Sequence, residues 1–98
     1  MSSFDLTTKA KEDLRKIAKY TELNWGKVKR NLYIKQFDDS FLLLAETPLI
    51  GTECDNIQTD YKKFPQGNHI IFYKTITKDK IKVIRILHKR MDVKSIFS

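Results

Sequence analysis

The pattern of apolar and polar residues divides this chain into a helical first half and a strand-rich second half. Ser3 to Leu6 alternates between polar and apolar residues, which predicts a short strand. Thr7 or Thr8 can then cap a helix through its side-chain oxygen. The apolar face of this helix repeats every three or four residues and consists of Ala10, Leu14, Ile17, Ala18 and Thr21.

A second helix is predicted after the corner Asn24-Trp25-Gly26, with Asn24 as its cap. It extends as far as Glu46, and Pro48 lies just beyond, where a residue that cannot continue a helix is expected. Two amphipathic helices joined by a tight corner form an αα-hairpin, which we expect to bury its shared face on a sheet. The apolar positions of the second helix are Val28, Leu32, Tyr33, Phe37, Phe41, Leu44 and Ala45.

The second half of the chain predicts a β-hairpin at the centre of that sheet. Two runs rich in β-branched and aromatic residues, His69 to Tyr73 and Lys80 to Leu87, flank the polar break Thr77-Lys78-Asp79. Both runs are apolar on both faces, which is typical of central, covered strands. Tyr61 to Pro65 alternates and predicts a third strand beside the hairpin.

The remaining segments predict connections. Residues 48–59 lack a regular pattern, and Leu49, Ile50 and Ile57 are expected to anchor them to the core. A short tail runs from Asp92 to Ser98. The expected fold is therefore α+β, a helical hairpin packed on a small, mainly antiparallel sheet in the order β-α-α-β-β-β, within a single domain spanning residues 1–98.

Charge is distributed unevenly along the chain. Residues 1–60 hold nine Lys or Arg and ten Asp or Glu, whereas residues 61–98 hold ten and two, a local excess of +8. Such an excess favours a polyanion or an acidic protein surface as a partner, although it could equally be a solvated basic surface.

Several classes of protein are disfavoured by what the sequence lacks. No apolar run approaches the roughly 20 residues that span a bilayer, and no signal peptide is evident, so a cytoplasmic protein without a membrane partner is expected. The single cysteine, Cys54, has no motif around it. One cysteine and two histidines at positions 69 and 88 do not form a metal-ligand pattern, and no phosphate-binding glycine loop exists, so no metal or cofactor is expected.

One catalytic hypothesis is worth stating. RNA cleavage would need a basic surface for phosphates and a histidine as acid or base. His88, next to Lys89 and Arg90, offers both, and His69 is the other candidate histidine. However, no residue is evident as the base for the 2′-hydroxyl, and neighbouring cations favour neutral histidine.

The helices also carry more large apolar residues than one face can bury. Tyr20, Tyr33, Ile34, Leu42 and Leu43 spread around them, which indicates either a wide core face or a surface for a partner. Trp25, at the corner, is either a contact residue for a partner or a staple that packs the corner onto the domain.

Read in order, the chain resembles the ParE toxins of the RelE/ParE superfamily, which belong to bacterial toxin–antitoxin modules. The match includes the run from Val83 to His88, and its part from Arg85 to His88 followed by Met91-Asp92 is the most specific part of the resemblance. At Lys62 the chain departs from the arginine that family members carry, which keeps the charge but loses the bidentate fork. The other matching residues are Leu6-Thr7, Ala10, Asp13-Leu14, Ile17, Tyr20-Thr21, Trp25-Gly26, Tyr33, Leu44-Ala45, Pro48, Gly51, Tyr61, Lys63-Phe64-Pro65, His69 and Ile71-Phe72-Tyr73.

This resemblance implies a non-enzymatic toxin that traps DNA gyrase on cleaved DNA, with the DNA-cleaving subunit as the expected contact. It also implies a ParD-like antitoxin that neutralises the toxin by wrapping an extended, partly helical segment around it. No direct binding of nucleic acid by the chain alone is expected. The alternatives are a ribosome-dependent mRNA endonuclease of the RelE type and an inactive module that only binds antitoxin.

Candidate contact residues follow from the resemblance and from position. Trp25, Ile96 and Phe97 are the candidates for gyrase, because they are large apolar groups at ends of the fold that we expect to be exposed. The candidates for antitoxin binding are Tyr20, Tyr33, Ile34, Phe37, Phe41, Lys62, Lys63 and Arg85.

Overall fold

The computed structural model describes residues 1–54 and 57–97. Its elements are β1 (Ser3–Leu6), α1 (Thr8–Glu46), η1 (Pro48–Ile50), β2 (Thr52–Glu53), β3 (Lys62–Gln66), β4 (His69–Thr77), β5 (Lys80–His88) and α2 (Val93–Phe97). The five strands form one sheet in the order β1-β5-β4-β3-β2. The pairing of β1 with β5 is parallel and the others are antiparallel, so the prediction of a mainly antiparallel sheet is confirmed.

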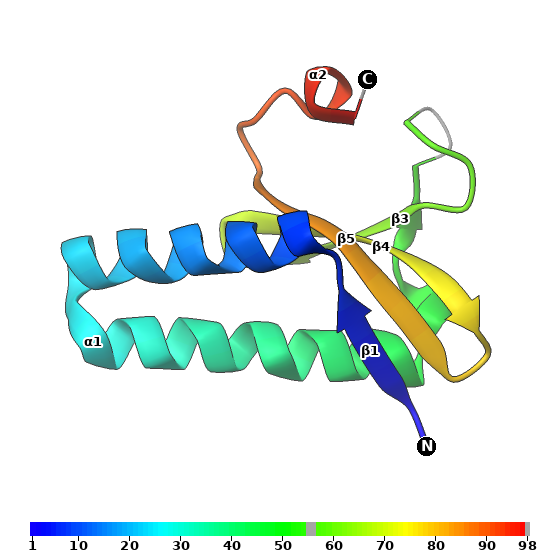
Figure 1. Ribbon diagram of the computed structural model, residues 1–98, viewed down its shortest axis with the longest axis horizontal. Helices are drawn as coiled ribbons and strands as arrows, with labels where there is room; N and C mark the ends of the chain where they lie inside the picture. Colours follow the sequence, from blue (N-terminus) through cyan, green and yellow to red (C-terminus); the bar gives the residue numbers. More distant parts are fainter. Residues whose placement is uncertain (55–56, 98) are drawn as a thin grey trace.

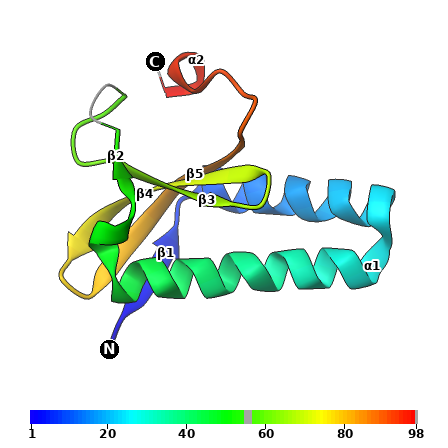
Figure 2. The same ribbon diagram turned by 180° about the vertical axis from the view of Figure 1, so that it is seen from behind.

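The α1 element is a hairpin of two helical arms, as predicted. Gly26 adopts φ 89° and ψ 172°, a conformation that only glycine adopts readily, and the chain reverses there. Figures 1 and 2 show the two arms side by side, reaching away from the sheet. Thr7 caps the first arm, because its Oγ1 accepts a hydrogen bond from the Ala10 amide at 3.0 Å.

The prediction that Asn24 caps the second arm is wrong. Its Nδ2 donates to the Tyr20 carbonyl at 2.8 Å, so the side chain satisfies an acceptor at the end of the first arm.

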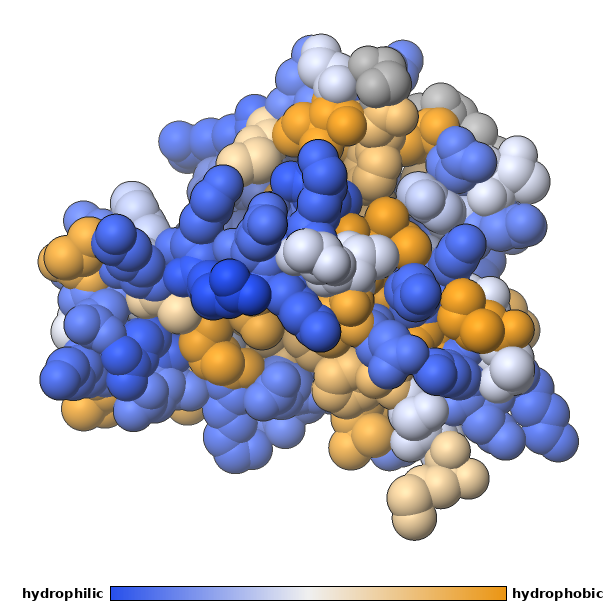
Figure 3. Space-filling view, viewed as in Figure 1, coloured by the Kyte–Doolittle hydropathy of each residue, from blue (hydrophilic) through white to orange (hydrophobic). Residues whose placement is uncertain are grey.

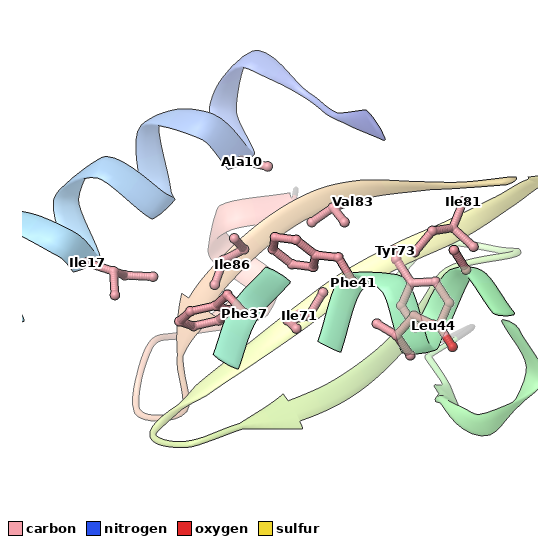
Figure 4. Packing of buried hydrophobic residues seen from close by; sticks show 11 residues of the cluster. Ala10, Ile17, Phe37, Phe41, Leu44, Ile71, Tyr73, Ile81, Val83 and Ile86 are labelled. Carbon is pink, nitrogen blue, oxygen red and sulfur yellow. The ribbon is translucent and has the colours of Figure 1, made fainter. Parts of the chain in front are cut away.

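The main core lies between the α1 hairpin and one face of the sheet. Phe37, Phe41 and Leu44 of the second arm pack against residues of β4 and β5, with the rings of Phe37 and Phe41 at 6.1 Å (Figure 4). Ile71 and Tyr73 come from β4, and Ile81, Val83 and Ile86 come from β5. This packing confirms that the 69–88 hairpin is central and covered.

The opposite face of the sheet has a smaller apolar cluster covered by the tail. Phe72 of β4 and Leu87 of β5 pack there against Ile96 and Phe97 of α2. Both ribbon views show α2 on the other side of the central strands from the second arm (Figures 1 and 2). The tail, which had no predicted structure, is therefore a short helix that completes the second layer.

The connection over residues 48–59 differs from its prediction in two respects. It contains η1 and β2, which is only two residues long and too short for a period to be visible. Leu49 and Ile50 are exposed, so they do not anchor the connection, whereas Ile57 packs on the smaller cluster as expected. Within the described residues, none of the helices is both long and apolar enough to cross a membrane.

Candidate functional site

A groove of about 480 Å³ opens between the α1 hairpin and the end of the sheet. Tyr20 and Trp25 line it from the first arm and the corner, Leu32 from the second arm, and His69 and His88 from β4 and β5. We call it the histidine groove. Its walls combine aromatic side chains with polar and charged ones, among them Lys29 and Gln36.

Tyr33 joins the second arm to the turn between β3 and β4 at the floor of this groove. Its hydroxyl donates to the Gln66 carbonyl at 3.2 Å, accepts from the Asn68 amide at 3.2 Å and lies 2.8 Å from Nδ1 of His69. A Cβ on Gly67 would fall 2.5 Å from the Tyr33 oxygen, so the turn approaches the ring too closely for any other residue. These contacts hold the arm and the turn in one position.

The two histidines face each other directly across the β4–β5 ladder. Their rings are nearly perpendicular, with centroids 5.3 Å apart. Burial lowers the pKa of His69 to about 4, with a smaller contribution from the nearby His88. His69 is therefore neutral near pH 7, and it serves the groove as a hydrogen-bonding group rather than as a cation.

The residues of the ribonuclease hypothesis are not brought together as a catalytic group. His88 faces His69 under the α1 hairpin, and its Nδ1 accepts a hydrogen bond from the Arg90 backbone amide at 3.1 Å. The side chains of Lys89 and Arg90 are exposed in the turn after β5. Among residues 1–54 and 57–97, no three or more His, Cys, Asp or Glu side chains form a group that could hold a metal ion.

A second hollow of about 460 Å³ lies at the β2–β3 edge of the sheet. Lys62, which lines it, is paired with Glu53 at 3.5 Å, so the two charges largely neutralise each other. The histidine groove, with its converging aromatic groups, is the better candidate for binding a partner.

Comparison with known proteins identifies the family. The family described as the ParE toxin of the type II toxin–antitoxin system parDE matches residues 4–93. The chain belongs to the ParE toxin family. The resemblance noted in the sequence is thereby confirmed.

Relatives within the family are similar over nearly their whole length. The chain is 34% identical to Toxin ParE1 of Mycobacterium tuberculosis over 92 residues, which is 94% of both chains. It is 28% identical to Toxin ParE1 of Caulobacter vibrioides over 95 residues, which is 97% of both. A solved chain of the chromosomal ParDE system from P. aeruginosa superposes with a TM-score of 0.74 at 17% identity, covering 90% of this chain and 96% of that one, which supports the fold.

Two of the antitoxin candidates cannot contact a partner in the folded chain. Phe37 and Phe41 are 0% exposed, because the second arm turns them toward β4 and β5, so this prediction is wrong. Spacing alone had placed them on an apolar helix face without showing that the sheet covers that face.

The other antitoxin candidates differ in accessibility. Tyr20 and Lys63 are exposed, and Tyr33, Ile34 and Lys62 are partly buried. Arg85 is held by Asp13 through two hydrogen bonds of 2.7 and 3.0 Å, and this contact raises the pKa of Arg85 above its ordinary value. The structure therefore places Tyr20 and Tyr33 at the histidine groove and gives Arg85 an intramolecular partner.

Asp13, which was noted in the sequence only as part of the family resemblance, has an important structural role that was not predicted. Besides holding Arg85, its Oδ2 accepts the Ile86 backbone amide at 3.0 Å, at a point of β5 beyond the residues paired with β1. A carboxylate three residues after Ala10 and four before Ile17 lies on the apolar helix face, and that position was the available signal.

The gyrase candidates also differ in how exposed they are. Trp25 is 68% exposed at the corner of the hairpin, so it is not a staple. Phe97 packs instead against Phe72 and Tyr61, with ring centroids 5.1 and 5.8 Å apart, and Ile96 belongs to the same cluster. The expectation that the tail residues are exposed is wrong, because they pack against the apolar side chains on the second face of the sheet.

Proposed function

We propose that this chain is a toxin that binds DNA gyrase, stabilises the enzyme on cleaved DNA and is neutralised by a ParD-like antitoxin. The observation that carries the proposal is the family match over residues 4–93, and the fold agrees with it. In this proposal the chain acts by binding, in the cytoplasm, and is not an enzyme.

The histidine groove supports the antitoxin part of this proposal. Tyr20 and Leu32 are exposed beside it, 66% and 52% respectively, so an amphipathic helix laid along the arms would bury apolar surface. The basic residues of the chain would meet acidic side chains of the antitoxin, which speeds association and sets orientation.

The site also supports action without catalysis. Tyr33 engages His69, and burial keeps this histidine neutral. One ring nitrogen of His88 accepts a hydrogen bond from the Arg90 backbone amide. Within the described residues, the side chains of Lys89 and Arg90 form no hydrogen bond or ion pair with His88. The groove thus resembles a surface for recognition more than a site for proton transfer.

The test is a cleavage assay with the purified chain, free of antitoxin, together with DNA gyrase and supercoiled plasmid. Linear plasmid released on denaturing the enzyme is the expected result, and adding a purified ParD-like antitoxin should abolish it. If gyrase is unaffected while the folded chain still arrests growth, the proposed target is wrong. Cleavage of mRNA on purified ribosomes would then be measured for the wild type and for His88→Ala.

A further inference from the structure

The corner of the α1 hairpin has no role in the core. Between Glu22 and Gln36 not one residue is buried, whereas the arms on either side contain Thr21 and Phe37, which are buried. Figure 1 shows this end of the hairpin reaching beyond the sheet. We call residues 15–35, the corner and the adjoining turns of both arms, the hairpin tip.

Large apolar side chains are exposed on the tip. Leu23, Trp25 and Val28 lie close to Gly26 in the sequence and are 75%, 68% and 83% exposed. Figure 3 shows hydrophobic surface interspersed with hydrophilic surface at this end of the molecule. Several large apolar side chains exposed at one protruding corner are typical of a protein-binding surface rather than of a solvated helix end.

The tip is also strongly basic. Residues 15–35 contain seven Lys or Arg and a single carboxylate, a net charge of +6 in a chain whose total is +7. The one carboxylate, Glu22, pairs with Arg30 across the two arms, and Lys35 pairs with Asp39. Within the described residues no ion pair engages the other five cations of the tip, Arg15, Lys16, Lys19, Lys27 and Lys29.

These two properties define the chemistry of a partner. The exposed Leu, Trp and Val side chains would be buried by an apolar pocket, which a nucleic-acid backbone does not offer. The cations would be complemented by Asp and Glu side chains around that pocket. A second copy of this chain would present a tip of the same charge, so like charges would oppose self-association there. The Arg30–Glu22 pair joins the two arms next to the corner.

We infer that the hairpin tip docks into an acidic-rimmed apolar pocket on the target protein, with Trp25 as the central anchor and Lys27 and Lys29 as steering charges. This inference rests on the proposed function, in which the target is DNA gyrase. It assigns target recognition to the tip, and because Trp25 and Lys29 also line the histidine groove, the surfaces proposed for the target and for the antitoxin overlap there.

Two tip variants and two matched controls test the inference. Trp25→Ala removes the anchor, and Leu49→Ala removes a side chain that is 82% exposed on η1, away from the tip. The double variant Lys27→Glu with Lys29→Glu changes the net charge by the same amount as Lys9→Glu with Lys78→Glu, whose exposed lysines lie outside the tip. Circular dichroism and thermal unfolding establish that each variant is folded.

Binding to purified gyrase is measured by biolayer interferometry at two salt concentrations, together with linear plasmid formation. Trp25→Ala should dissociate from gyrase at least about tenfold faster than the wild type. The Lys27/Lys29 variant should associate about tenfold more slowly at low salt, and this difference should shrink at high salt. Both control variants should bind and cleave as the wild type does.

Each other outcome overturns a distinct part of the argument. If both tip variants bind gyrase and promote cleavage as the wild type does, the docking inference is wrong and the proposed function stands. If the Lys9/Lys78 control weakens binding as much as the Lys27/Lys29 variant, total charge and not the tip governs recognition, which also overturns the inference. If plasmid alone binds the wild type and loses that binding in the tip variants, the partner is DNA and not a protein pocket. If the wild type does not bind or affect gyrase, the proposed function fails, and the inference fails with it.

Discussion

Asp13 shows how much of the fold depends on a single carboxylate. It connects the first arm of α1 to β5 by accepting two hydrogen bonds from the Arg85 guanidinium and one from the Ile86 amide. The carboxylate provides a hydrogen-bond acceptor for a backbone amide of β5, at a point where β1 no longer pairs with that strand. Replacing either partner leaves the other with an unpaired, largely buried charge.

We therefore predict that Asp13→Asn lowers the free energy of unfolding by about 3 kcal/mol, since one partner of a mostly buried charge pair is lost. Urea unfolding of wild type and variant measures the difference. Asp39→Asn is the control, because its pair with Lys35 is exposed and should contribute less than about 0.5 kcal/mol. Equal losses in the two variants would show that the Asp13–Arg85 pair has no special structural role.

At the scale of elements, local periodicity predicted most of the fold. The two arms, β1 and β3 have a visible repeat in the sequence, the β4–β5 hairpin has two apolar runs around a polar break, and each of these elements is present. The parallel pairing of β1 with β5 was not predictable in this way, because a repeat reports which face of a strand is apolar and not which strand lies beside it. For the same reason Val28 and Leu32, which continue the apolar face of the second arm, are exposed beyond the end of the sheet.

The candidate site was less predictable than the fold. Tyr20, Trp25 and Tyr33 were chosen from the sequence and lie at the groove or the tip, but the meeting of His69 with His88 depends on strand register. The basic tip was hidden by the balanced charge of residues 1–60, since the acidic residues of that segment lie mostly outside residues 15–35.

The tail provides a prediction at this scale. Phe97 packs on Phe72 and Tyr61 and covers the second face of the sheet, so Phe97→Ala should lower the free energy of unfolding by about 1 to 2 kcal/mol. Leu49→Ala, which removes an exposed side chain of η1, should change it by less than about 0.5 kcal/mol. Chemical denaturation of both variants checks the comparison, and a stable Phe97→Ala protein would mean that α2 contributes little to the fold.

For the whole molecule, the burial of His69 makes stability depend on pH. The pKa of this residue is about 4 in the folded chain and near its ordinary 6.5 in the unfolded chain. Between these values the unfolded state binds more protons, so the free energy of unfolding decreases as the pH falls from 6.5 toward 4. We expect the free energy of unfolding to fall by about 2 kcal/mol. This is less than the full difference between the two pKa values implies, because the ring is only partly buried.

Urea unfolding at several pH values between about 4.5 and about 7 measures this loss. His69→Gln, which cannot titrate, should remove that part of the pH dependence. Asp5 and Asp92 do not interfere, because their pKa values are lowered below 3.8 and their contributions are lost only at more acidic pH. An unchanged pH profile in His69→Gln would assign the dependence to other groups.

The position of β5 also has a consequence for synthesis. The strand made first, β1, pairs with the strand made last, and β5 contributes Ile81, Val83 and Ile86 to the main core. A nascent chain that has not yet extended past residue 80 can form the helical arms but has neither the partner of β1 nor the centre of the sheet. The folded chain therefore arises only after β5 has been synthesised, and a product truncated before β5 would have no folded surface with which to act.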